Sequence, residues 1–132
     1  MKKAISIIIL FLITALSFSA ISEEDSKKAA SETLNCLKEI NEALSIFKKK
    51  KDITTENKTK LIKAVNKLKA LKIKITAMKR TASAEEIKKL NKEFNTGIYA
   101  VALKIEVKKL FSHIKRVRKI EGGAVIANLV TL

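Results

Sequence analysis

Residues 30–47, ASETLNCLKEINEALSIF, and residues 61–78, LIKAVNKLKALKIKITAM, decide the fold of this chain. In each stretch apolar side chains recur every three or four residues, which places them on one face of a helix. These faces contain Ala30, Leu34, Leu37, Ile40, Leu44 and Phe47 in the first stretch, and Leu61, Val65, Leu68, Leu71, Ile75 and Met78 in the second. Each stretch therefore predicts an amphipathic helix that buries one side against the rest of the protein.

Residues that stabilise helix ends bracket both stretches. The first helix is predicted over about residues 25–50, with a cap at Asp25 or at the residue after it. The second is predicted over about residues 55–80, with Thr54 or Thr55 as its cap. Four lysines lie at the predicted C-terminal end of the first helix, where positive charge interacts favourably with the negative end of the helix dipole.

A third helical segment begins at a capping box. Ser83 is followed three residues later by Glu86, and the segment runs to the stop signal Gly122-Gly123. An unbroken helix of about 38 residues would span roughly 57 Å, against roughly 39 Å for the second helix. The segment is therefore expected to break or to overhang its neighbours. The expected break is near Thr96-Gly97, because Gly costs about 1 kcal/mol inside a helix relative to Ala.

The apolar residues of the third segment form two separate stripes. One contains Ile87, Leu90, Phe94, Val101 and Ile105, and the other contains Leu103, Val107, Leu110, Ile114 and Val117. Residues 97–103 between them are apolar nearly all round, which predicts that they are buried on all sides. Residues 124–132 carry no charge and are expected to dock on the body or on a partner.

Residues 1–22 have the pattern of a secretory signal peptide. Lys2 and Lys3 precede an apolar run over residues 4–20, and small residues at 20 and 22, or at 17 and 19, suit cleavage. The protein is therefore expected to be exported, either to a periplasm or to the medium. An uncleaved membrane anchor formed by residues 4–20 is the alternative, since that length is at the short end of what spans a bilayer.

The composition excludes several classes of protein. Among 132 residues there are one Cys, no Pro and three Gly, too few for a disulfide scaffold, a Cys-based zinc site or a many-stranded sheet. The hydrophobic fraction of 47% is too high for a disordered chain. The predicted fold is all-α, a bundle of three or four helices at residues 23–123, behind a signal peptide at 1–22 and before the apolar tail at 124–132.

Positive charge is concentrated in the middle of the chain. The formal net charge is +15, and residues 48–80 alone hold thirteen basic side chains against two acidic ones. Two helical faces gather lysines by the rule of 100° per residue. These are Lys60, Lys63, Lys67 and Lys74 in the second helix, and Lys104, Lys108, Lys115 and Lys119 in the third segment. Both rows are candidates for binding an anionic partner.

Three kinds of partner suit such lysines in an exported protein: an anionic lipid, a polyanionic wall polymer or an acidic protein. Nucleic acid is disfavoured, because export removes the usual encounter and the lysines are not interleaved with aromatic side chains for base stacking. Two alternatives remain open. The lysines can be ordinary solvated surface, and the protein can be a structural one whose apolar helix faces pair with another chain or with a second copy.

Candidate chemistry is sparse. Cys36, the sole Cys, lies at the edge of the first apolar stripe, where it can serve as a small buried side chain or form an intermolecular disulfide. His113, the sole His, has only Glu106 as a ligand-type residue on its face, so no metal site is predicted. No catalytic constellation is present, and the protein is expected not to be an enzyme.

One short stretch has a known counterpart. Residues 32–35, ETLN, followed by Leu37-Lys38, are similar to the first helix of the periplasmic b-type four-helix cytochromes. In that family a Met supplies an axial haem ligand, whereas Ser31 stands at the corresponding position here. The chain also has no CxxCH for covalent haem attachment. No cofactor is therefore predicted.

Overall fold

The computed structural model describes residues 21–130, which form five α-helices and one short 3-10 helix, with no strand among them. The elements are α2 (Glu23–Ser45), η1 (Lys50–Asp52), α3 (Thr55–Thr81), α4 (Ala84–Thr96), α5 (Ala100–Arg118) and α6 (Gly123–Val130). The all-α class is confirmed for this part of the chain, with more helices than the three or four predicted. Residues 1–20 of the predicted leader, and with them the alternative anchor at residues 4–20, lie outside the described residues, whereas Ile21 and Ser22 are described.

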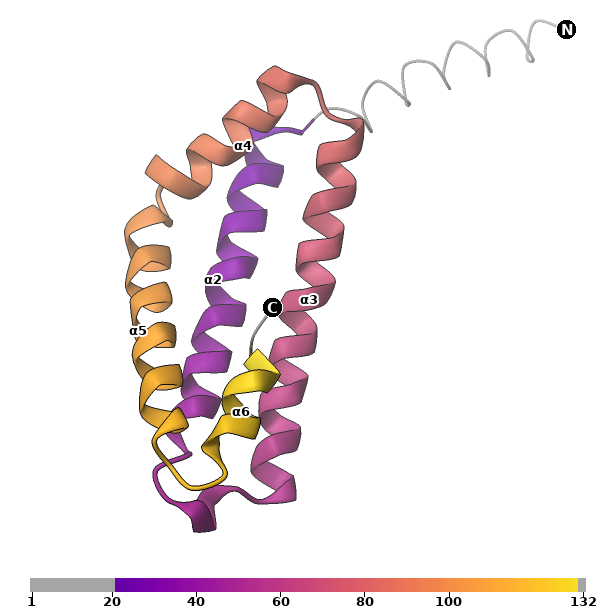
Figure 1. Cartoon of the computed structure of the whole chain (residues 1–132). Coiled ribbons are helices and arrows are strands. Elements are labelled where there is room, and N and C mark those ends of the chain that lie inside the picture. Colours follow the sequence, from indigo (N-terminus) through magenta and orange to yellow (C-terminus); the bar gives the residue numbers. More distant parts are fainter. Residues whose placement is uncertain (1–20, 131–132) are drawn as a thin grey trace, which may run out of the picture.

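Helix α2 is the centre of the arrangement. It contacts α3 on one side and α5 on the other, and α4 crosses its N-terminal end (Figure 1). The short α6 packs against α5 and α3, and Figure 1 shows it near the C-terminal end of α2, on the side toward α3. The main core joins the first apolar stripe to Leu61, Val65 and Leu68 of α3, and to buried residues of α5 and α6. Both predicted stripes thus face the core, although Ile75 and Met78 are only half-buried.

The first helix begins earlier than the sequence indicated. Its N-cap is Ser22, whose hydroxyl accepts the backbone N–H of Asp25 at 3.0 Å, while the Asp25 carboxylate accepts the N–H of Ser22 at 3.3 Å. This reciprocal pair is a capping box, so Asp25 is its third residue and not its cap. Ile21 comes just before and is buried with Ala29 and Leu90, which attaches the start of α2 to α4.

The same helix also ends earlier than predicted, at Ser45 and not near Lys50. Lys48 and Lys49 therefore lie in the turn before η1, and Lys50 and Lys51 form the first part of η1. The carboxylate of Asp52 accepts the backbone N–H groups of Lys48 and Lys49, at 3.0 and 2.8 Å, which closes this turn. Phe47 lies beyond the helix end yet is fully buried, and it carries the apolar stripe of α2 into the turn.

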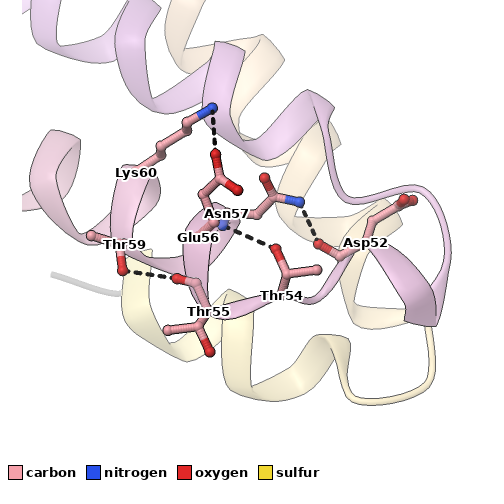
Figure 2. A network of polar contacts seen from close by, with 7 residues as sticks. All are labelled: Asp52, Thr54, Thr55, Glu56, Asn57, Thr59 and Lys60. Carbon is pink, nitrogen blue, oxygen red and sulfur yellow. Dashed lines mark hydrogen bonds and ion pairs between the residues drawn. The ribbon is translucent and has the colours of Figure 1, made fainter.

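Local polar contacts define the start of α3 (Figure 2). Thr54 is the N-cap, and its hydroxyl accepts the N–H of Asn57 at 3.1 Å. The Asn57 side chain donates to the carbonyl of Asp52 at 2.7 Å and so ties the helix to the preceding turn. Lys60 forms an ion pair with Glu56 at 3.8 Å one turn into the helix.

The third segment is divided at the predicted place. Helix α4 starts after the Ser83 capping box and ends at Thr96, and α5 starts at Ala100. The Gly97 N–H donates to the Glu93 carbonyl and closes α4. The expectation that residues 97–103 are buried on all sides is wrong, because Ile98 and Val101 are 76% and 70% exposed. The apolar stripe of α4 does not continue past the bend, because α5 buries a different side of its surface.

The two glycines after α5 reverse the chain. Gly122 has a φ of +81°, which favours residues without a Cβ. A Cβ on Gly123 would clash with the carbonyl oxygen of Val117, so only Gly allows this approach. The described part of the apolar tail then forms α6, which buries Ile126, Ala127 and Val130 on the body. None of the helices in residues 21–130 combines the length and the hydropathy needed to cross a bilayer.

Candidate binding surface

A buried polar contact and an apolar stripe decide which side of α5 faces outward. Leu103 and Val117 are buried, and Leu110 lies half-buried between them. Glu106, on the same side, is 6% exposed, and Asn41 of α2 donates to its backbone carbonyl at 2.9 Å and to its carboxylate at 3.4 Å. These contacts turn the opposite side of α5, which contains its lysine row, away from α2.

The α5 lysine row consists of Lys104, Lys108 and Lys115 within α5 and Lys119 at its C-cap, and all four are exposed. The row extends over about 22 Å at 1.5 Å per residue. None of these four lysines takes part in the ion pairs found among residues 21–130. Glu106 is the sole acidic residue of α5, and it is buried and paired with Lys109 at 3.3 Å. The positive charge of the row is therefore not neutralised within its own helix.

The α3 lysine row, Lys60, Lys63, Lys67 and Lys74, has different surroundings. Its members are also exposed, but they border the seam between α3 and α2, where α2 carries acidic side chains. Lys67 crosses this seam to pair with Glu39 at 3.1 Å, and Lys60 is paired within its own helix. Since α2 lies between α3 and α5, the structure does not join the two rows into one face.

Sequence analysis missed the apolar side chains that lie among the α5 lysines. Val101 belongs to the segment that is expected to be buried, and Ile105 belongs to the same predicted apolar stripe, yet they are 70% and 49% exposed, and Phe111 is 67% exposed. Lys104 and Ile105 follow Val101 by three and four residues, and Lys108 follows them by four and three, which places apolar and cationic side chains on one outward face. That mixed spacing was the sequence signal that could have identified the surface.

Arg116 is a second feature that the sequence did not reveal. Its guanidinium donates to the carbonyl of Leu44 at 2.9 Å and to that of Phe47. These carbonyls belong to the last turn of α2 and the residues after it, where helices leave acceptors unsatisfied. No basic side chain of α2 itself lies in that turn. These hydrogen bonds of Arg116 therefore attach the C-terminal end of α5 to the end of α2, and they help to keep the lysine row on the side of α5 that faces away from α2.

His113 lies on the inner edge of α5, beside the Arg116 fastening. Its Nδ1 is 3.3 Å from the Arg116 guanidinium, and it lines an open hollow of about 480 Å³ with Asn41 and Glu106. Partial burial lowers the pKa of His113 from its ordinary value of 6.5, and the cations of Arg116 and Lys109 lower it further, against an opposing effect of Glu106. Among the described residues, no three potential ligands are grouped to hold a metal ion.

Replacing His113 with Gln is expected to change how stability depends on pH. Protonation is less favourable in the folded protein, so the free energy of unfolding should fall as pH drops below about 6.5, the unfolded value, and level off below the lowered folded pKa. The variant should lack this component, because Gln does not titrate. Urea unfolding at a series of pH values between 5 and 8 measures the free energy of unfolding as a function of pH. If this pH dependence is the same in the variant and the wild type, His113 is not its source.

Cys36 lies half-buried on α2 at the margin of the main core, next to the seam with α3. Burial raises the pKa of its thiol, the Glu39 carboxylate raises it further, and Lys67 opposes this shift. The thiol therefore stays protonated at neutral pH, which suits a small packing side chain more than a reactive one. The intermolecular disulfide remains a prediction, which electrophoresis without reductant can test.

The described residues thus form a small all-α protein with a cationic and partly apolar outer helix. Compared with known proteins, the chain matches no family model, no curated protein and no solved structure. Its function is therefore inferred from its own residues.

Proposed function

We propose that the protein is exported and binds an anionic envelope component or an acidic partner through the α5 lysine row, without catalysing a reaction. The observation that carries the proposal is the unpaired state of Lys104, Lys108, Lys115 and Lys119 on an outward face. Keeping four like charges close together without local carboxylates favours a ligand that supplies the negative charge. The α3 row contributes less to the proposal because α2 supplies it with carboxylates.

A salt titration tests this function directly. The leaderless protein should sediment with vesicles that contain phosphatidylglycerol, or bind a soluble polyanion such as polyphosphate, at low ionic strength. Binding should weaken as salt rises, since the Debye length falls from about 10 Å at 0.1 M to about 3 Å at 1 M. Vesicles of phosphatidylcholine alone are the control. Absence of binding to every anionic probe, or binding that ignores salt, would refute the electrostatic proposal.

The folded residues also favour one of the two cleavage positions that the sequence allows. Ile21 is buried, and its N–H donates to the Glu86 carboxylate, while Ser22 caps α2. Cleavage after Ser22 would remove both contacts, whereas cleavage after residue 19 would keep them. We therefore expect the exported form to start at Ala20, as judged by intact mass. A mature chain that starts at Glu23 would contradict this choice, and a full-length mass in the membrane fraction would support the anchor.

A further inference from the structure

Exposed apolar side chains are concentrated on one part of the molecule. Of the nine large apolar side chains that are exposed within residues 21–130, five lie between residues 98 and 111. Single exposed apolar residues are ordinary on protein surfaces, but a group of them marks a surface that contacts something else. Ile98, Val101 and Phe111 are each at least 67% exposed, so they contribute little to the core of this protein.

Three of these apolar side chains, those of Val101, Ile105 and Phe111, occupy the same outward side of α5 as the lysine row. Lys104 and Ile105 follow Val101 by three and four residues, Lys108 follows them by four and three, and Phe111 lies three residues after Lys108. Figure 1 shows α5 at the outer edge of the molecule, on the far side of α2 from α3. We name this surface, formed by Val101, Lys104, Ile105, Lys108, Phe111 and Lys115, the α5 face.

The charge of the α5 face argues against a second copy of this chain as its partner. Two such faces would bring lysines against lysines, and the sole carboxylate of α5, that of Glu106, is buried on the opposite side. Like charges in contact are destabilising. The face therefore requires a partner that is both anionic and able to accept apolar side chains.

We infer that the α5 face docks on an anionic phospholipid bilayer, with its apolar side chains in the headgroup region and its lysines at the lipid phosphates. A helix with lysines beside exposed apolar residues lies in the plane of such an interface. Lysine stems can lie along the apolar region while the ammonium groups reach the phosphates. Protein–protein interfaces are instead depleted in Lys and enriched in Arg, whereas the α5 face contains three lysines and no Arg.

This inference rests on the proposed function and adds the identity of the partner. An anionic polymer or a soluble polyanion would use the lysines but would not take up Val101, Ile105 or Phe111. A bilayer uses both kinds of side chain, so salt should weaken its binding without being the sole determinant of affinity. The contribution of the apolar side chains therefore separates a bilayer from other anionic partners.

The test compares two pairs of exposed apolar residues in the leaderless protein. Ile105→Ser with Phe111→Ser changes the α5 face, and Ile62→Ser with Ile73→Ser is the matched control on α3, where these side chains are 40% and 71% exposed. The α5 pair should lower affinity for phosphatidylglycerol-containing vesicles at least tenfold while leaving polyphosphate binding unchanged. The control pair should change neither affinity, and thermal unfolding should show that both variants are folded.

A fluorescent reporter gives a second readout that removes no apolar side chain. The chain contains no Trp, so Phe111→Trp and Ile73→Trp each introduce a single emitting group. Emission of the first variant should shift to shorter wavelength with anionic vesicles, and emission of the second should not.

Four results would overturn the inference. If wild-type protein binds vesicles but neither the α5 pair nor the Trp reporter differs from its control, the proposed function stands and the bilayer inference is wrong. If no anionic probe binds, both fail. Sedimentation showing a dimer that the α5 pair dissociates, without vesicle binding, would assign the face to a second copy. Binding to an acidic polypeptide that depends on Ile105 and Phe111, without vesicle binding, would assign it to an acidic protein.

Discussion

Replacing the four lysines of the α5 row with Gln is expected to weaken binding to phosphatidylglycerol-containing vesicles by about three orders of magnitude at low salt. Each lysine near an anionic surface contributes about 1 kcal/mol, so four contribute about 4 kcal/mol, and every 1.4 kcal/mol is a factor of ten. The change should leave the fold intact, because the four side chains are exposed and Gln is as good a helix former as Lys. Vesicle sedimentation measures the affinity, and circular dichroism checks the helix content.

The α3 row supplies a control with the same change in net charge. Substituting Gln for Lys60, Lys63, Lys67 and Lys74 also removes four positive charges, but two of these lysines already pair with Glu56 and Glu39. The loss of affinity should stay below about tenfold, which reflects the weaker attraction of the whole molecule. Equal losses in the two variants would mean that net charge governs binding and that no particular face does so.

Truncation of Phe47 to Ala is expected to have the largest effect on stability, a loss of about 3–5 kcal/mol in the free energy of unfolding. Phe47 is fully buried in the main core although it lies two residues beyond the end of α2. Its loss would leave a cavity beside the turn that Arg116 fastens to α5. Urea unfolding monitored by circular dichroism measures the change.

The neighbouring residue is a suitable control for this stability measurement. Ile46 is 37% exposed, and Ile46→Ala should cost less than the Phe47 substitution because more of its side chain is already in contact with water. A cost below about 1 kcal/mol for Phe47→Ala would show that the turn is loosely packed. In that case the end of α2 would not contribute to holding α5 in place.

Much of the fold follows from local sequence. The intervals in residues 30–47 and 61–78 place apolar side chains on one face of each helix, and both faces meet in the core. The Ser83 capping box and the break at Gly97 were also predictable, because caps and glycines act on the backbone next to them. The early end of α2 was not, since Arg116 meets its last carbonyls from a helix about 70 residues later.

The character of the candidate surface depended on tertiary structure. The sequence alone determined that the chain is helical, that it is strongly basic, and that lysines line one side of two helices. Tertiary structure decided that carboxylates of α2 approach the α3 row while the α5 row stays unpaired, and that Val101 and Ile105 face outward. Helical periodicity specifies which side chains share a face, whereas the packing of distant segments determines which face is covered.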